Sequence, residues 1–236
     1  MKKKYRIAGL LVAMESFGRT ARQAIPYLCH SEQKEDFTVL SNRQVVKDKF
    51  PDVSEDMAEY LSTGSSFYAQ LLNYDGFRLH SSAVVVDGKA YLFTANCGTG
   101  KSTHTQLWLK YFGDRAYILN DDKPALRLLD GKWYAFGTPW SGKDDISVNT
   151  GVELAGIAVL ERAEKNEIEP YSGKYAIFDV FRQANRPKEF ELREKLLTLI
   201  GKLVVDIPLW KLKCNMEMEA AEIAYSAMHA GQESKR

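Results

Sequence analysis

Residues 91–103 constrain this chain more than any other stretch. They read Tyr-Leu-Phe-Thr-Ala-Asn-Cys-Gly-Thr-Gly-Lys-Ser-Thr, so an apolar run leads into a glycine-rich turn and then into a helical pattern that begins near Lys101. The turn matches Gly-x-x-x-x-Gly-Lys-[Ser/Thr], the pattern of a loop that cradles phosphate groups, except that Ala95 stands at the first glycine. Because Gly98 and Gly100 follow Ala95, the backbone can still curl so that its N–H groups point inward.

The loop predicts a nucleotide site in which backbone N–H groups and side chains have separate roles. The residues expected to hold phosphate are Cys97, Gly98, Thr99, Gly100, Lys101, Ser102 and Thr103. Among them, Lys101 is expected to reach the β- and γ-phosphates, and the Ser102 hydroxyl is expected to bind Mg²⁺. The implied cofactors are therefore ATP and Mg²⁺. The alternative interpretation is an ordinary glycine turn between a strand and a helix.

Two adjacent aspartates follow a second apolar run. Residues 116–120 have the pattern of a buried strand, and Asp121 and Asp122 come directly after it. In phosphate-loop enzymes an acidic residue at such a strand end reaches the Mg²⁺. Because side chains alternate across a strand, one aspartate can face the metal while the other faces an acceptor hydroxyl. The alternative is a polar turn before Pro124.

A histidine is expected beside the phosphate loop. Two β-rich runs meet at Asp87-Gly88, which is a strong signal for a tight hairpin turn. The register of that hairpin places His80 opposite Ala95. His80 is therefore a candidate for stabilising charge or orienting an acceptor, with a purely structural histidine as the alternative.

The combination of His80, the hairpin, the loop 97–103 and the aspartate pair resembles the kinase domain of HPr kinase/phosphorylase. That family shares a nucleotide-binding core with phosphoenolpyruvate carboxykinase, and the resemblance covers about residues 77–163. It implies catalytic roles for Asp121 (general base), His80 and Lys101, and Mg²⁺ ligands in Ser102 and Asp122.

The sequence departs from that family in its details. Ser81 follows the histidine where HPr kinases have glycine, and their Glu-x-Arg-Gly-x-Gly signature is absent. The N-terminal part also differs from theirs. The chain looks more like compact HPr-kinase-like proteins, some of which accompany peptide-modification clusters and phosphorylate serine on peptides.

The expected fold is α/β, with a mixed-sheet kinase core of the HPr kinase/phosphoenolpyruvate carboxykinase type and a small N-terminal α+β accessory layer. The sheet should be mixed because the phosphate loop follows a hairpin strand rather than a βαβ series. The expected domains are residues 1–76 (accessory) and 77–230 (kinase). Strands are predicted over 5–15, 37–40, 116–120, 125–129, 132–136, 154–160 and 204–214, and helices over 54–73, 190–203 and 217–229.

Composition excludes some partners. A net charge of +1 gives no general attraction for nucleic acid or an anionic membrane. The apolar run 7–14 is too short for a membrane span and is read as part of a strand. Three cysteines without metal-ligand spacing fit reduced thiols, so a cytoplasmic location is expected.

The function predicted from these features is an ATP- and Mg²⁺-dependent kinase. It would transfer the γ-phosphoryl group to a serine-type hydroxyl of a peptide, small protein or small molecule. One alternative is a catalytically silent nucleotide-binding module. Another is a carboxykinase-type enzyme, although that chemistry needs several arginines around its acid substrate. The sequence leaves oligomerisation open.

Overall fold

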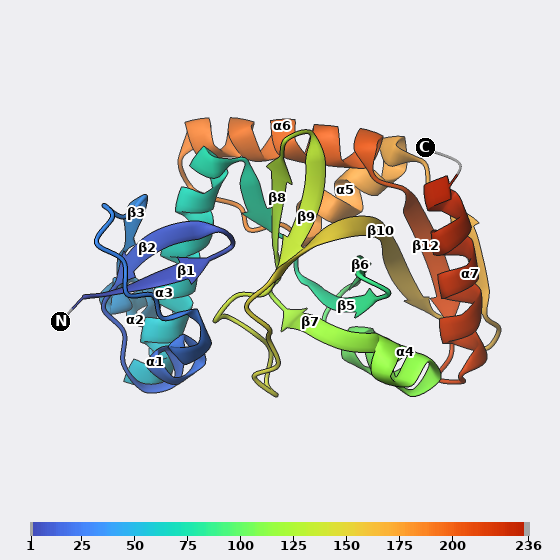
Figure 1. Ribbon diagram of the computed structural model, residues 1–236, viewed down its shortest axis with the longest axis horizontal. Coiled ribbons are helices and arrows are strands. Elements are labelled where there is room, and N and C mark those ends of the chain that lie inside the picture. The colour runs from blue at the N-terminus through green and yellow to red at the C-terminus, as the bar shows by residue number, and fades with distance from the viewer. Residues whose placement is uncertain (1, 234–236) are drawn as a thin grey trace.

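The computed structural model describes residues 2–233 and shows a mixed α/β protein (Figure 1). A small three-stranded sheet occupies the N-terminal side, and a larger curled sheet with helices on both faces forms the core. No helix within the described residues has both the length and the apolar character needed to cross a bilayer.

The N-terminal region combines three short strands with three helices. Its elements are β1 (Lys3–Ile7), β2 (Leu10–Met14), α1 (Gly18–Gln23), β3 (Phe37–Val39), α2 (Arg43–Lys49) and α3 (Glu55–Leu71). The prediction of one strand over 5–15 is wrong, because the chain reverses at Ala8-Gly9, where φ is +51° and +80°. Around the turn, residues 7–14 are all apolar and only Gly9 among them is exposed, so the sequence shows no polar residue that would mark the turn.

Helix α3 begins where the sequence predicts. The Ser54 side chain accepts a hydrogen bond from the backbone N–H of Met57 at 3.2 Å, which satisfies one of the otherwise unpaired donors of the first turn. The helix continues through Gly64 to Leu71. It packs between the small sheet and the core, because Tyr60, Phe67 and Leu71 share one apolar cluster with residues of both.

The core is built from nine strands and four helices within residues 76–233. The strands are β4 (Gly76–Arg78), β5 (Ser81–Val86), β6 (Lys89–Thr94), β7 (Ala116–Asp122), β8 (Ala125–Leu129), β9 (Lys132–Phe136), β10 (Gly151–Arg162), β11 (Glu167–Pro170) and β12 (Leu209–Cys214). The helices are α4 (Lys101–Phe112), α5 (Gly173–Gln183), α6 (Phe190–Asp206) and α7 (Glu219–Glu233). Short 3₁₀ turns lie at Ile25–Tyr27, Leu72–Tyr74 and Gly113–Arg115.

The large sheet is mixed, as predicted. Its order is β4-β8-β9-β10-β6-β5-β7, and β12 pairs with both β10 and β11. The long strand β10 joins two halves, since it pairs antiparallel with β9 at its start and parallel with β6 and β12 further along. Figure 1 shows β10 curling through the centre of the molecule.

Because side chains alternate along each strand, the two faces of the sheet contribute to two separate cores. In β5, Ala83 and Val85 pack in the cluster that contains α5 and α6. Val84 and Val86 pack in the cluster that contains α4 and α7. Because helices cover both faces, all six residues of β5 are buried, and the last four of them, residues 83–86, read as one apolar run.

The predicted hairpin at Asp87-Gly88 is confirmed by the pairing of β5 with β6, and the predicted strands over 125–129 and 132–136 pair with each other as β8 and β9. The predicted last strand begins too early, because residues 204–206 belong to α6. Helices α1, α2 and α5 and strand β11 were not predicted. In α5 the aromatic side chains of Tyr175 and Phe178 are exposed.

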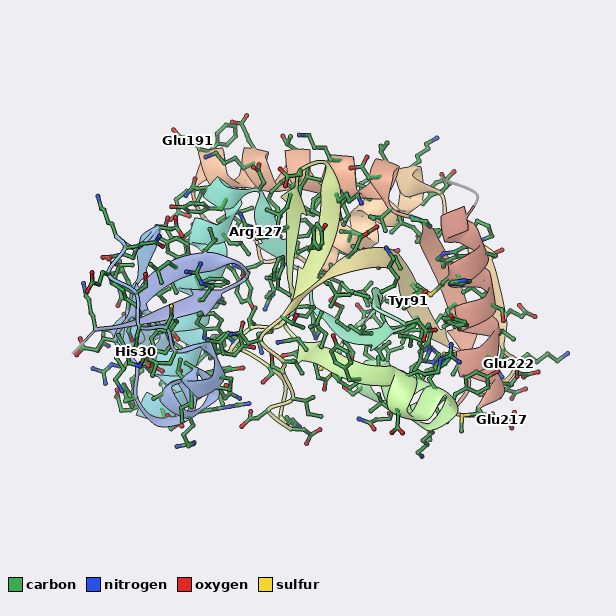
Figure 2. All side chains as sticks on the ribbon, in the orientation of Figure 1. His30, Tyr91, Arg127, Glu191, Glu217 and Glu222 are labelled. Carbon is green, nitrogen blue, oxygen red and sulfur yellow. The ribbon has the colours of Figure 1, made fainter. Side chains whose placement is uncertain are left out.

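Arg127 links the core to the N-terminal hairpin. It extends from β8, donating from Nη1 to the carbonyl of Ala8 at 2.8 Å and from Nε to the carbonyl of Tyr74 at 3.0 Å. Figure 2 labels Arg127 beside this hairpin. Burial lowers the pKa of Arg127, and nearby Asp75 and Asp36 oppose that effect. A buried arginine bonded to two carbonyls holds the two regions together.

We predict opposite stability effects for the same substitution at two helical glycines. A Cβ at Gly64 of α3 would lie 2.9 Å from Cδ1 of the buried Trp140, whereas one at Gly201 of α6 meets nothing within 4 Å. Gly64→Ala should therefore lose about 1–3 kcal/mol of unfolding free energy through overpacking. Gly201→Ala should gain up to about 1 kcal/mol through helix propensity. Urea unfolding followed by circular dichroism measures both, and equal effects would contradict the packing of Trp140 on α3.

Candidate functional site

The candidate site lies at one edge of the large sheet, where the phosphate-loop sequence and the aspartate pair meet. Strand β5 is antiparallel to both β6 and β7, so the carboxyl ends of β6 and β7 reach the same edge. Ser81 at the start of β5 stands opposite Thr94 on one side and Asp122 on the other. Together with the confirmed register, this places His80 beside the start of the loop, and the Thr94 hydroxyl donates to the His80 carbonyl at 2.9 Å.

The loop between β6 and α4 is curled and open. Gly98 and Gly100 have φ of +77° and +113°, a region that glycine enters without strain, and nothing lies within 4 Å of a Cβ built on either. The Lys101 ammonium group lies against the loop, donating to the carbonyls of Ala95 at 3.1 Å and Asn96 at 3.4 Å. Burial lowers the pKa of Lys101, and the charges of Asp122, Cys97 and Asp121 oppose that effect.

Ser102 and Asp121 contact each other directly. The Ser102 hydroxyl lies 3.0 Å from Oδ1 and 2.9 Å from Oδ2 of Asp121, which is buried at the end of β7. The loop 142–146 holds the Asp121 backbone on both sides, because Asp121 donates its N–H to Ile146 and accepts from the N–H of Gly142. The side chain expected to bind Mg²⁺ and one of the two aspartates are thus adjacent.

Asp122 has a different set of partners. Its Oδ1 lies 2.9 Å from Nε2 of His80, and its Oδ2 accepts from the Lys123 ammonium group. The His80 ring is fixed from its other side, where Nδ1 lies 2.9 Å from Oε1 of Gln183. Burial alone would raise the pKa of Asp122, but the hydrogen bond with His80 and the charge of Lys123 outweigh it and hold the pKa well below its usual value.

A bulge in β7 determines which aspartate faces which partner. The pairing with β5 shifts by one residue between Ala83 and Val84, so Leu119 is an extra residue in β7. Ile118 packs on the α4 face, and strict alternation from it would turn Asp122 toward α4. Because of the bulge, Asp121 contacts Ser102 of α4 instead, while Asp122, with φ of +96°, turns toward His80. The predicted metal pair, Ser102 with Asp122, is therefore not the pair that the structure brings together.

Three residues of the site were missed in the sequence. Arg162, at the end of β10, donates to the loop carbonyls of Thr99 at 3.0 Å and of Gly98. Gln183, at the end of α5, contacts both His80 and, at 3.4 Å, the Asn96 side chain. The fully buried Asn120 donates to Thr138 and Ser147 and accepts from the backbone of Lys123. A polar residue inside an apolar strand was the available signal for Asn120.

Two clefts flank the loop. One, of about 380 Å³, lies between residues 94–99, the end of β10 and the side chains of Asp179 and Gln183. The other, of about 280 Å³, lies between the start of α4 and the ends of β10 and β12, and Leu160, Cys214 and Met216 contribute to its apolar lining. Arg162 lines both clefts.

The residues present fit a nucleotide with Mg²⁺. The open curl, the ammonium group of Lys101 and the start of a twelve-residue helix supply donors for phosphate oxygens. No group of three or more His, Cys, Asp or Glu side chains that could hold a metal occurs among residues 2–233. A Mg²⁺ ion in such sites needs only one or two protein ligands, because phosphates and water supply the rest, and Ser102 with Asp121 provides such a pair.

His104 has a structural role in the core. His104 is buried in α4, accepts from the Trp108 indole at 3.1 Å and has its pKa lowered to about 4 by burial, so it is a neutral packing residue. His30 lies in the N-terminal region (Figure 2). Lys143, in the loop that follows β9, is exposed. Cys97 is exposed in the loop.

Comparison with known proteins finds similarity to solved structures but not to known sequences. No family model matches the chain, and no curated protein matches its sequence. The structure matches the HPr(Ser) kinase/phosphatase from Coxiella burnetii with 13% identity and a TM-score of 0.38, over 66% of this chain and 95% of that chain. That protein belongs to the family that the sequence resembles. The similarity is too distant to assign residues, so the proposals below rest on the contacts in this chain.

Proposed function

We propose that the protein is an ATP- and Mg²⁺-dependent kinase that phosphorylates a serine-type hydroxyl of a peptide, small protein or small molecule. One observation supports this above the others. Ser102, at the mouth of an open phosphate-type loop, contacts one aspartate of a pair, while the second aspartate is held beside that loop by His80. In this proposal residues 77–230 form the kinase domain, and residues 1–76 form an accessory region.

Nucleotide binding is assigned to the loop and its two flanks. The backbone N–H groups of residues 97–103 would hold the phosphates, and the Lys101 ammonium group would move from the loop carbonyls to a phosphate oxygen. Arg162 already reaches the loop from β10 and would add a second cation. The more apolar cleft beside Cys214 and Met216 suits the base, because bases stack on apolar surface.

The transfer step needs little chemistry from the protein beyond positioning and charge. The acceptor oxygen attacks the terminal phosphorus, its proton passes to a carboxylate, and the bond to the bridging oxygen breaks to release ADP. Mg²⁺, when bound, supplies positive charge to the phosphate oxygens. Lys101 and Arg162 supply further positive charge where negative charge develops on the leaving group.

The contacts favour exchanging the roles that the family resemblance implies for the two aspartates. Asp121 shares the α4 side with Ser102, so we assign this pair to Mg²⁺. Asp122 is held by His80 and Lys123, so we assign it to the acceptor hydroxyl, with His80 fixing its orientation. A carboxylate with a lowered pKa acts mainly by aligning the hydroxyl, since it takes the proton only as the oxygen–phosphorus bond forms.

Transfer to a cellular acceptor tests the function itself. Cell lysate is incubated with γ-labelled ATP and either wild-type protein or Lys101→Ala. We expect a component that is labelled only with the wild type, because Lys101 contacts phosphate in both binding and transfer. Thermal stabilisation by ATP without any labelled component would contradict the kinase and would support the silent nucleotide-binding module.

Two matched variants test the roles of the aspartates. Asp121→Asn should raise the Mg²⁺ concentration needed for half-maximal transfer by about tenfold or more, because it removes a charge beside the metal. Asp122→Asn should lower the single-turnover rate by about 10²–10⁴-fold with little change in that Mg²⁺ concentration. The opposite pattern would restore the assignment that the family resemblance implies, with Asp121 as the base and Asp122 at the metal.

A further inference from the structure

A small cationic pocket lies next to the aspartate pair, between α3 and the core. Its volume is about 160 Å³, and its lining includes Tyr60 and Tyr68 of α3 together with Arg78, Lys123 and Asn185 of the core. It does not share any lining residue with the two clefts that flank the phosphate loop. The nucleotide assignment therefore leaves this pocket unexplained.

The pocket carries positive charge without a matching carboxylate in its lining. Arg78 and Lys123 line it, and no aspartate or glutamate does. Nε of Arg78 is buried without a hydrogen-bond partner, and the guanidinium group forms no ion pair with any residue of the described range 2–233. A buried donor without an acceptor destabilises the fold, so this group is suited to an acceptor that the chain itself does not supply.

The surroundings of Arg78 keep it in place. Its guanidinium carbon lies 6.0 Å from the centre of the Tyr68 ring, and its backbone pairs with Ala125 of β8. The Tyr68 hydroxyl is itself anchored to Thr138 and to the carbonyl of Lys123. An arginine held against an aromatic ring loses little side-chain entropy when it binds a planar or tetrahedral anion.

The pocket is also close to the proposed acceptor carboxylate. Lys123 lines the pocket and donates to Asp122, whose other oxygen contacts His80. Arg78 precedes His80 by two residues, and Leu79 between them pairs with Ala184, the residue before Asn185 of the pocket. Lys123 therefore connects the pocket with the carboxylate that we assign to the acceptor hydroxyl.

We infer that this pocket binds an anionic group of the acceptor, a carboxylate or a phosphate, and so selects hydroxyl substrates that carry an acidic group close to the hydroxyl. The role of this pocket in acceptor selection rests on the proposed kinase function, but anion binding at Arg78 can be tested without it. The volume admits one such group with a few attached atoms, which excludes a second nucleotide.

A binding experiment tests the pocket independently of phosphate transfer. The full chain is labelled with ¹⁵N-arginine in a Lys101→Ala background, which weakens phosphate binding at the loop, and the Nε–H signals are followed by NMR. The Arg78 signal is assigned from its loss in Arg78→Gln. Sodium malonate, sodium phosphate and sodium chloride are added in parallel at matched ionic strength.

We expect the Arg78 signal to shift in a saturable way with malonate, phosphate or both, and the exposed Arg186 to respond only as it does to chloride. Saturation by malonate alone identifies a carboxylate site, and saturation by phosphate alone identifies a phosphate site. An Arg78 response no larger than that to chloride overturns the inference.

A kinetic experiment then tests acceptor selection, using the labelled component as acceptor. Arg78→Gln should raise the acceptor KM by about 10–100-fold and leave the ATP KM unchanged, since a hydrogen bond to a charged group is lost. Arg78→Lys should recover part of this loss, and the surface control Arg186→Gln should have no effect. An unchanged acceptor KM in Arg78→Gln overturns the inference while the kinase stands. Absence of transfer by the wild type contradicts the kinase, and the NMR titration still decides the pocket.

Discussion

The placement of strand β5 between β6 and β7 is the constraint on which the candidate site depends. A slip of one residue in β5 would move every one of its side chains to the opposite face. Since Ala83 and Val85 fill one core and Val84 and Val86 fill the other, such a slip would disrupt both at once. The fixed register sets Ser81 between Thr94 and Asp122. Packing far from the site therefore determines which polar groups meet at its edge.

The N-terminal region contributes to the same edge through the loop that follows β9. Trp140 of this loop is fully buried, stacks on Phe67 of α3 at 4.9 Å and donates to the Thr63 hydroxyl. Arg19 of α1 donates to the carbonyl of Gly142, and Gly142 donates to the carbonyl of Asp121. The N-terminal region thus fixes the position of the loop, and the loop in turn fixes the backbone of Asp121. The pocket around Arg78 lies along this same junction, so the region without a chemical motif of its own helps to shape the proposed acceptor side.

The sequence predicted local features well where the signal was local. Turn residues at Asp87-Gly88 fixed one hairpin, Ser54 marked the start of α3, and Gly98 and Gly100 marked the curled loop. The sequence did not predict the features that depend on pairing between distant segments. The bulge at Leu119 reverses the faces of Asp121 and Asp122, and nothing within β7 announces it. Arg162 and Gln183 reach the site only because β10 lies beside β6 and α5 ends near His80.

The most direct test of the central claim is a crystal structure of the protein with Mg²⁺ and a non-hydrolysable ATP analogue. The account predicts that the β- and γ-phosphates occupy the curl around Gly98–Lys101, with the metal held beside Ser102 and Asp121 and with Asp122 still facing His80. Phosphates bound elsewhere on the chain, or a Lys101 side chain that still donates to the carbonyls of Ala95 and Asn96 in the presence of saturating analogue, would contradict it.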